Sequence, residues 1–446
     1  MFNSSTIYQP SKTMSYITND MTICQSDYPL DWYQPEFIPY AEEYQALPDR
    51  KLTTIIDWMK PYVLKAQDHF GHRLLLLAHY YMGGDIVRLI EQFGGQIGDS
   101  YQLALMAATH PEKTVIVESA VHFMAESISI LANNNQQVYI TNPKSGCTME
   151  MLAKDFMVEP AFLDLNARYG EDNILPVCYM NTSGRVKAMT GAQGGAVCTS
   201  SNVKKIFQWA QKQHKKILFI PDQHMGENVA YWLGINKIAY WPGGTAGAQY
   251  SLDEQNQTTL QTFDAAELIL FASHCAVHTH YQPEMCHYWH DLRYTTIVHP
   301  ECRNDVIRVA NQAGSTAFIW DYVVNDRGGT KRYAIGTENH MVDNLKQYCK
   351  SLNIEVVNLA EAPHNNSKGV GCGCATMSRN DPPHLVGLLD LLRLGKAMPY
   401  NEVKAGDMVN EFTGSRQRLT SNDQSWVIAN AKKALQKMID ITEGYI

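Results

Sequence analysis

Three cysteines that are far apart in the chain have the same local surroundings. Each follows a short apolar run of strand length: Cys147 follows residues 138–141, Cys275 follows 268–271, and Cys374 follows 354–359 and a longer loop. Each also lies in a turn that contains glycine or histidine. Cysteines this distant cannot form a local metal knuckle. They can meet only if three separate units direct their strand ends toward one centre.

Three thiolates suit two kinds of metal centre. One is a [4Fe–4S] cluster in which one iron has no protein ligand, and the other is a zinc ion with an open position. Zinc sites usually use clustered spacing such as Cys-x2-Cys, which this chain lacks, and a ferredoxin-type run is also absent. Six other cysteines are interpreted as small buried apolar side chains: Cys24, Cys178, Cys198, Cys286, Cys302 and Cys349.

Histidines also recur near the ends of apolar runs. These are His79, His278 and His299, and Tyr81 and Glu301 lie two residues after the first and the third of them. Imidazole, phenol and carboxyl groups can exchange protons near neutral pH when their surroundings adjust the pKa. A single histidine is more often structural, but three at equivalent strand ends favour function. The alternative for Glu301 is a charge at the N-terminus of a helix.

Hydroxyl side chains lie at three places where a strand gives way to a helix, namely Ser100, Ser200 and Thr316. There the hydroxyl and the free backbone N–H groups can hold a phosphate or a carboxylate. The alternative is that all three are plain helix N-caps, which would look the same in sequence. Tyr179 and Asn181, at another strand end, offer neutral hydrogen bonds that suit a dicarboxylate.

The elements that must position these residues alternate between strands and helices. Short continuous apolar runs predict strands that are buried on both faces, as in a parallel sheet covered by helices. The expected strands are 74–78, a short one ending at Gly98, 114–118, 138–141, 174–179, 195–198, 216–220, 268–271, 295–298, a weaker segment that carries Gly314-Ser315-Thr316, 332–335 and 354–359. They form three tandem units. Because ligands of open parallel sheets lie beyond the carboxyl ends of the strands, the three units would share one central cavity.

The length supports this division, since 446 residues exceed the size at which one hydrophobic core usually stops growing. We predict an α/β fold of three tandem, pseudo-symmetric, Rossmann-like αβα domains with parallel sheets. The predicted domains are residues 52–165, 166–290 and 291–446, and the last includes C-terminal helices. Residues 1–51 are expected to form an irregular arm that wraps the globular part. Apolar spacing predicts further helices over 52–69, 385–394 and 426–441.

Composition excludes several classes of protein. The net charge of −8 argues against a nucleic-acid surface, which would gather Lys and Arg. No apolar run approaches the roughly 20 residues that cross a bilayer, and the first 31 residues do not resemble a signal peptide. Ten cysteines without an export signal indicate the reducing cytoplasm. No Gly-x-Gly-x-x-Gly opens a helix, so a bound dinucleotide is not expected.

A series of short motifs resembles the quinolinate synthase family, in the family's order and over roughly residues 70–440. The motifs are His79-Tyr80-Tyr81, Gly98-Asp99-Ser100, Phe123-Met124-Ala125-Glu126, Asn142-Pro143-Lys144-Ser145-Gly146-Cys147, Tyr179-Met180-Asn181-Thr182-Ser183, Cys198-Thr199-Ser200-Ser201-Asn202, Cys275-Ala276-Val277-His278, His299-Pro300-Glu301 and the block 371–385. Two features depart from the family. The usual Trp-x-Gly before the middle cysteine is replaced by residues 271–274, and the second unit is longer between 232 and 264.

The resemblance implies three αβα domains around a central [4Fe–4S] cluster. It also implies condensation of iminoaspartate with dihydroxyacetone phosphate to quinolinate, phosphate and water, in the formation of NAD. The iron ligands would be Cys147, Cys275 and Cys374. Cys374 is preferred to Cys372 because the residues after it match those after the family's last ligand. An iron with an open position is a Lewis acid that can help a hydroxyl group leave as water.

The resemblance also implies roles for the strand-end residues. The catalytic set is Tyr81, Glu301, His299 and His79, and Glu301 is the best candidate for moving protons in the late steps. The substrate-binding set is His79, Ser100, Tyr179, Asn181, Ser200, His278, His299, Glu301 and Thr316.

Two other functions stay open from the sequence. One is an aconitase-like Fe–S hydro-lyase, and the other is a non-enzymatic Fe–S sensor or carrier. A transient contact with an aspartate-oxidising enzyme that supplies iminoaspartate is also left open. Neither a nucleic acid nor a membrane is expected as a partner.

Overall fold

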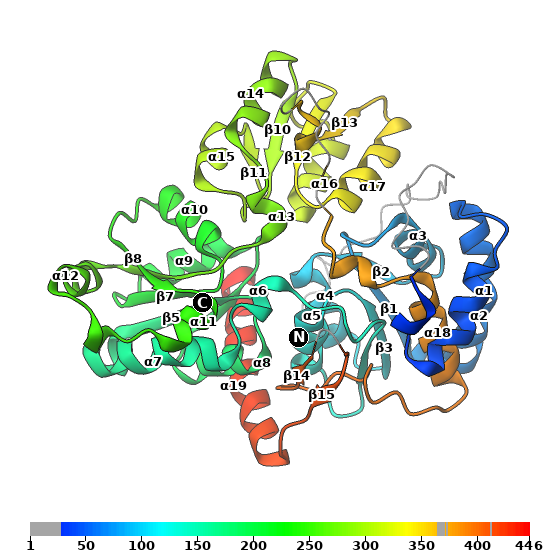
Figure 1. The fold of residues 1–446 in the computed structure, drawn as a ribbon, viewed down its shortest axis with the longest axis horizontal. Helices are drawn as coiled ribbons and strands as arrows, with labels where there is room; N and C mark the ends of the chain where they lie inside the picture. The colour runs from blue at the N-terminus through cyan, green and yellow to red at the C-terminus, as the bar shows by residue number, and fades with distance from the viewer. Residues whose placement is uncertain (1–27, 364–370, 372, 411–412) are drawn as a thin grey trace.

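The computed structural model describes residues 28–363, 371, 373–410 and 413–446. Three parallel sheets form three lobes around a shared centre (Figure 1). The first sheet has the order β2 (Gln96–Gly98), β1 (Leu74–His79), β3 (Val115–Ser119), β4 (Gln137–Ile140). The second has the order β6 (Ala196–Cys198), β5 (Ile174–Tyr179), β7 (Lys216–Ile220), β9 (Leu268–Ala272), β8 (Ile238–Pro242). The third has the order β11 (Gln312–Ala313), β10 (Thr295–Val298), β12 (Arg332–Gly336), β13 (Glu355–Asn358).

The three sheets repeat one topology. In each, the first strand of the unit lies between the second and the third strands in sequence, and all pairings are parallel. Every residue of β1 and of β5 is buried, as expected for strands that helices cover on both faces. Burial of each large apolar side chain stabilises the fold by roughly 1.5–3 kcal/mol. These findings confirm the predicted α/β class with parallel sheets flanked by helices.

Helices connect the strands. In the first unit they are α3 (Gly84–Gln92), α4 (Ser100–Thr109) and α5 (His122–Leu131). In the second they are α6 (Thr148–Met151), α7 (Asp155–Tyr169), α8 (Gly184–Ala192), α9 (Val203–Gln211), α10 (Gln223–Leu233), α11 (Gly244–Gln249), α12 (Gln257–Ala265) and α13 (Ala276–Thr279). In the third they are α14 (Pro283–Asp291), α15 (Asn304–Val309), α16 (Thr316–Val324) and α17 (Asn339–Lys350). Among the described helices, none combines the length and apolar character needed to cross a membrane.

Strand β8 was not expected. It lies in the longer stretch between residues 232 and 264 and pairs with β9 at the edge of the second sheet, so this sheet has a fifth strand. Trp241 and Ala239 of β8 are buried while Tyr240 is 45% exposed. This alternation of burial is typical of an edge strand. The residues of β8 are themselves apolar, like the runs that predict the other strands, but they end in a proline.

The two ends of the described chain pack against the first two lobes. In the arm, two short 3-10 turns, Leu30–Trp32 and Pro35–Phe37, lead into α1 (Ile38–Gln45), which packs against α18 (Pro382–Arg393). This part of the arm is therefore helical, and residues 1–27 lie outside the described chain. Helix α2 (Leu52–Phe70), as predicted, also packs against α18.

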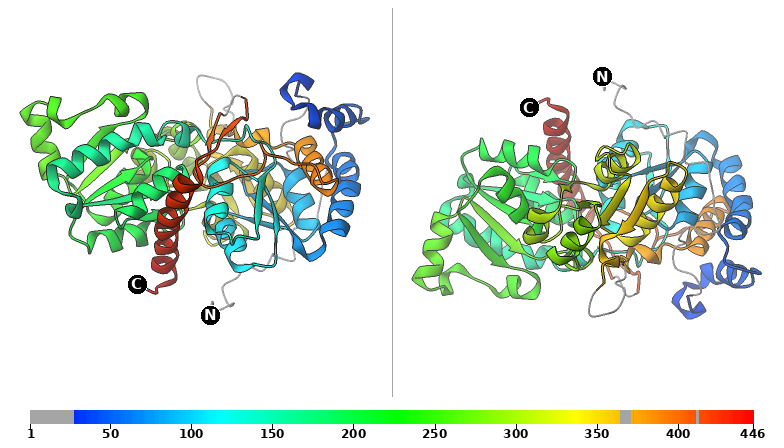
Figure 2. Two further views of the ribbon diagram at one scale, coloured as in Figure 1. Left: turned by 90° about the horizontal axis from the view of Figure 1, so that it is seen from below. Right: turned by 90° about the horizontal axis from the view of Figure 1, so that it is seen from above.

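The C-terminal helix α19 (Ser421–Glu443) begins earlier than the predicted 426, and Thr420 caps it. It packs against α8, β6 and α9 of the second unit and against α5 of the first, and it lies between these two lobes (Figure 2). A two-stranded ribbon, β14 (Met408–Val409) and β15 (Arg416–Gln417), precedes it. The boundaries of the three domains stay a prediction.

Candidate active site

One cavity of about 290 Å³ lies where the strand ends of the three sheets face one another. Every residue that the sequence singled out for a site lines it, and the residues come from all three units. They are His79, Tyr81, Ser100, Cys147, Tyr179, Asn181, Ser200, Cys275, His278, His299, Glu301, Thr316 and Cys374. Apolar side chains such as Phe123, Met124 and Val277 complete the wall.

The repeated topology explains this convergence. His79, Tyr179 and His299 end or follow the equivalent strands β1, β5 and β10. Ser100, Ser200 and Thr316 follow β2, β6 and β11, and the three cysteines follow β4, β9 and β13. Each sheet therefore brings the same three strand ends to the centre.

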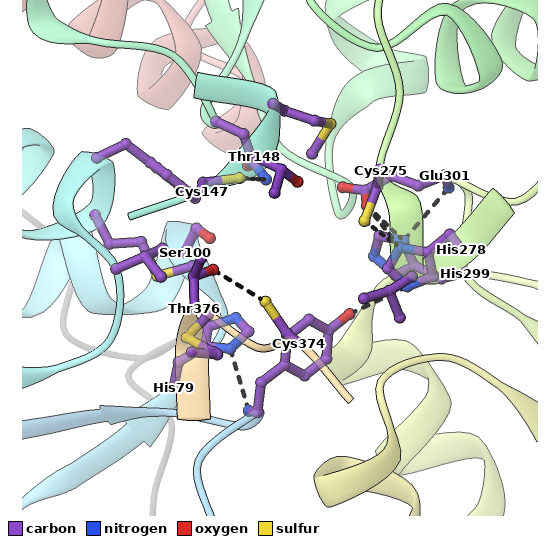
Figure 3. Close-up of a pocket in the computed structure, with 18 of the residues that line it drawn as sticks. His79, Ser100, Cys147, Thr148, Cys275, His278, His299, Glu301, Cys374 and Thr376 are labelled. Atoms are coloured by element: carbon purple, nitrogen blue, oxygen red, sulfur yellow. Dashed lines mark hydrogen bonds and ion pairs between the residues drawn. The ribbon is translucent and has the colours of Figure 1, made fainter. Parts of the chain in front are cut away.

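The sulfur atoms of the three cysteines point into the same open space (Figure 3). Cys147 lies at the N-cap of α6 and Cys275 at the N-cap of α13. Backbone N–H groups face each sulfur: those of Glu150 and Met149 face Cys147, that of His278 faces Cys275, and those of Met377 and Thr376 face Cys374. Burial nevertheless raises the pKa of all three thiols.

These surroundings fit an Fe–S cluster. Three thiols converge from three sheets, amide groups are directed at each sulfur, and the described part of the lining contains no fourth cysteine. Buried thiols whose pKa is raised stay protonated on their own, whereas a bound metal displaces the protons and neutralises the thiolates. Cys372, the alternative to Cys374, lies outside the described residues.

The other described cysteines agree with the interpretation as buried apolar side chains. Cys178, Cys198, Cys286, Cys302 and Cys349 all have exposed fractions of 0%. Cys24 lies outside the described residues.

Glu301 and His278 form a close, buried contact beside Cys275. The distance from His278 Nδ1 to Glu301 Oε2 is 2.7 Å, and from the same nitrogen to Cys275 Sγ it is 3.2 Å. Burial opposes the charge of Glu301, but the contact with His278 and a hydrogen bond from Tyr179 outweigh it and hold the pKa of Glu301 below its usual range. Helix α15 begins at Asn304 with Arg303 as its N-cap, so Glu301 is not a helix cap.

His79 and His299 are held as neutral imidazoles. Burial lowers the pKa of each to about 3. His79 Nδ1 accepts a hydrogen bond from the backbone N–H of Tyr81 at 3.2 Å, and His299 Nδ1 accepts one from that of Glu301 at 3.3 Å. When Nδ1 of a neutral ring is an acceptor, Nε2 carries the proton. Both rings therefore offer an Nε2–H donor at equivalent strand ends.

Tyr81 and His278 share one partner. Thr337 Oγ1 lies 2.9 Å from the Tyr81 hydroxyl and 3.1 Å from His278 Nε2. Burial and the charge of Glu301 raise the pKa of Tyr81 well above its usual value, so the phenol keeps its proton. The same two causes raise the pKa of Tyr179. Both phenols are therefore neutral donors.

None of the three hydroxyl residues is a helix N-cap, because Asn202 holds that position before α9 and the other two follow the cap residue. Asp99 caps α4 and forms a capping box with Gln102, which leaves Ser100 as the first helical residue. In the same way Ser315 caps α16 through the N–H of Phe318, and Thr316 follows it. Thr316 Oγ1 is buried and has no hydrogen-bond partner within the described chain. A hydroxyl left without a partner at a cavity wall is available to a ligand.

Several contacts around the cysteines were not predicted. Asn181 Nδ2 lies 3.8 Å from Cys147 Sγ, and Thr376 Oγ1 lies 3.4 Å from Cys374 Sγ. Glu338, which caps α17, accepts a hydrogen bond from the backbone N–H of Cys374 at 3.1 Å and so attaches this loop to the third sheet. Thr337 and Glu338 directly follow β12, and their strand-end position was the signal that could have identified them.

Comparisons with known proteins show which family this chain resembles over most of its length. The sequence matches the family described as Quinolinate synthetase A protein over residues 63–402. The quinolinate synthase of Geobacillus kaustophilus (strain HTA426) is 35% identical over 382 residues, which cover 84% of this chain and 91% of that protein. The quinolinate synthase of Geobacillus thermodenitrificans (strain NG80-2) is 34% identical over 400 residues, with 88% and 96% covered. That of Bacillus cereus (strain AH187) is 33% identical over 378 residues, with 82% and 93% covered.

Proposed function

This chain belongs to the quinolinate synthase family, and we propose that it condenses iminoaspartate with dihydroxyacetone phosphate to quinolinate, inorganic phosphate and water in the formation of NAD. The observation that supports this most is the convergence of Cys147, Cys275 and Cys374, each from a different sheet, on one cavity that also contains acid–base and hydroxyl side chains. The proposal places the protein in the reducing cytoplasm, where such thiols remain free to bind metal.

Cys147, Cys275 and Cys374 would hold a [4Fe–4S] cluster. When bound, its iron without a protein ligand would supply a Lewis acid for the loss of water. Two of the cysteine loops are fixed by other parts of the site. Glu338 holds the backbone of Cys374, and Asn181 lies against the sulfur of Cys147.

The substrates carry carboxylates, a carbonyl group and a phosphate, and the cavity offers neutral donors for each. Ser100 and Thr316 lie in the first turns of α4 and α16, and each offers a hydroxyl donor at the cavity wall. The Nε2–H groups of His79 and His299 add two further donors. Neutral donors hold an anion without adding a charge that would have to be desolvated in this buried site.

Glu301 and His278 are the acid–base pair of the proposal. The 2.7 Å contact lets a proton move between the carboxylate and the imidazole, and Thr337 holds the other ring nitrogen at 3.1 Å. Ring closure requires proton removal from carbon and proton delivery to a leaving oxygen. A positioned pair of this kind contributes typically 10²–10⁴-fold to such steps.

The experiment that tests this function is product analysis with the anaerobically purified protein. Iminoaspartate, generated in place from oxaloacetate and ammonia, is supplied with or without dihydroxyacetone phosphate, and quinolinate is detected by its aromatic absorbance and by mass. We expect quinolinate and one phosphate per turnover only when both substrates are present. A hydro-lyase would act on a hydroxy acid without the triose phosphate, and a sensor would form no product, so either result would exclude the proposal.

A further inference from the structure

A second cavity of about 290 Å³ lies where the N-terminal arm meets the loop after β4 and the turn before α18. Its described lining shares no residue with the active-site cavity. The lining is small and chemically mixed. It contains two cations, Lys144 and Arg379, one carboxylate, Asp31, and a set of aromatic rings from the arm.

The two cations hold neighbouring loops together. Arg379 Nη1 donates a hydrogen bond to the backbone oxygen of Lys144 at 2.6 Å, and Lys144 Nζ donates one to the backbone oxygen of Trp32 at 2.9 Å. Burial lowers the pKa of Lys144, and the charge of Arg379 lowers it further, while Asp31 acts in the opposite direction. An anion placed between the two cations would offset their repulsion and form charge-assisted hydrogen bonds.

The aromatic side of the cavity is only partly covered. One face of Trp32 stacks on Tyr28 with ring centroids 5.1 Å apart, yet 55% of the Trp32 surface is exposed. An exposed indole beside a cavity can stack with a further planar group. The arm therefore contributes ring surface close to the two cations.

The opposite wall is rigid. Tyr33 stacks on His384 at 4.8 Å, and Asp381 accepts hydrogen bonds from both, at 2.5 Å from the Tyr33 hydroxyl and at 2.6 Å from His384 Nδ1. All three side chains are buried, and Asp381 also caps α18. A preorganised wall reduces the ordering cost when a ligand binds.

We propose that this second cavity binds a small planar aromatic anion, with its carboxylate or phosphate between Lys144 and Arg379 and its ring against Trp32. Two sources share this chemistry, a pyridine dicarboxylate and a nucleoside monophosphate. Only the first source rests on the proposed function, because it would be the reaction product. The loops that form the site continue to Cys147 and Cys374, so a bound anion would also restrain two of the three cysteine loops.

Calorimetric titration of the full-length, anaerobically purified protein tests the proposal. The probes are pyridine-2,3-dicarboxylate, adenosine monophosphate and inorganic phosphate, each used alone. Lys144→Gln is expected to weaken binding of an aromatic anion about 10-fold or more, because a charge-assisted hydrogen bond is lost. Asp31→Asn is expected to tighten it, and a misfolded variant could not produce that gain. Lys60→Gln removes the same charge from an exposed position of α2 and is the matched control.

The ring contact has its own test. Trp32→Leu is expected to weaken binding of the aromatic probe several-fold and to leave inorganic phosphate unaffected, whereas Trp426→Leu, at a tryptophan of similar exposure on α19, changes neither. The probe that responds to these variants identifies the source. Wild-type affinity for both aromatic probes in Lys144→Gln and Asp31→Asn, or no binding of either probe, would overturn the proposal. These results are independent of whether the protein forms quinolinate.

Discussion

Two buried clusters in this protein have similar side chains and different surroundings. One consists of Cys275, His278 and Glu301, and the other of His122, Glu126 and Glu150. In each cluster the possible ligand atoms lie within 4.8 Å of one another. Composition alone would make both of them candidate metal or catalytic sites.

The partners of the carboxylates separate the two clusters. Glu126 accepts hydrogen bonds from the backbone N–H groups of Gly184 at 2.6 Å and Gly406 at 2.7 Å, so it joins α5 to the start of α8 and to the C-terminal segment. Glu150 pairs with His122 at 3.0 Å. Lys187, also fully buried, supplies positive charge to both carboxylates. The second cluster is therefore a structural junction between segments of the chain.

The Glu301 cluster differs because its members line a cavity. Cys275, His278 and Glu301 all lie in the wall of the active-site cavity, whereas His122, Glu126 and Glu150 do not. The partners of Glu301 are also titratable side chains that can exchange protons. The lesson is that a buried charge held by backbone amides stabilises a fold, while one held by side chains at a cavity can do chemistry. Four predictions test this contrast.

The largest effect is expected for Cys275 of the first cluster and for the two cysteines that share its cavity, Cys147 and Cys374. Replacing Cys147, Cys275 or Cys374 by alanine should abolish quinolinate formation and remove the iron and sulfide that we expect in the wild-type protein after anaerobic purification. Cys302→Ala, at a fully buried cysteine outside the cavity, is the control and should keep both. Iron and sulfide analysis measures the outcome. Retention of about four irons per chain by any of the three variants would contradict the assignment of the ligands.

Glu301→Gln should lower kcat by about 10²–10⁴-fold, because the substitution keeps the shape of the side chain and removes the proton acceptor. Steady-state kinetics with both substrates measures this, and iron content and circular dichroism should match the wild-type protein. A variant that keeps full kcat would show that the pair with His278 is only structural.

Glu126→Gln should leave the chemistry of the cavity intact and destabilise the fold. The loss should be roughly 1–3 kcal/mol, because the Gln amide nitrogen cannot accept the hydrogen bond that Gly184 or Gly406 donates and because Lys187 loses part of the negative charge near it. Thermal unfolding of the Glu126→Gln variant and of the wild-type protein measures the loss of stability. The double variant Glu126→Gln, Lys187→Met should recover part of the loss. Unchanged stability together with lost iron would reverse the roles assigned to the two clusters.

The smallest effect contrasts two adjacent residues. Thr316→Val should raise KM several-fold with little change in stability, because its hydroxyl has no partner within the described chain. Ser315→Ala removes the N-cap of α16 and should cost about 1 kcal/mol of stability without a comparable change in KM. Steady-state kinetics and thermal unfolding of both variants measure these two effects. If Thr316→Val lowered stability while Ser315→Ala raised KM, Thr316 would be the structural residue.

The sequence by itself determined the local elements and the residues at their ends. Continuous apolar runs identified β1, β5 and β7 closely, because a strand buried on both faces is apolar at nearly every position. Strand β8 is also an apolar run, but its proline and its half-exposed edge position are untypical of the buried strands that this pattern predicts. The polar residue after each strand could also be recognised from the sequence, because the apolar run stops where the strand gives way to a turn.

Only the tertiary structure decided which of those residues act together. Neighbouring residues such as Ser315 and Thr316 look alike in sequence, and the helix geometry alone makes one a cap and leaves the other at the cavity. The junction around Glu126 was equally invisible, because its partners Gly184 and Gly406 are distant in the chain and contribute only backbone amides. Contacts of this kind depend on the packing of separate lobes, which no local pattern of residue types encodes.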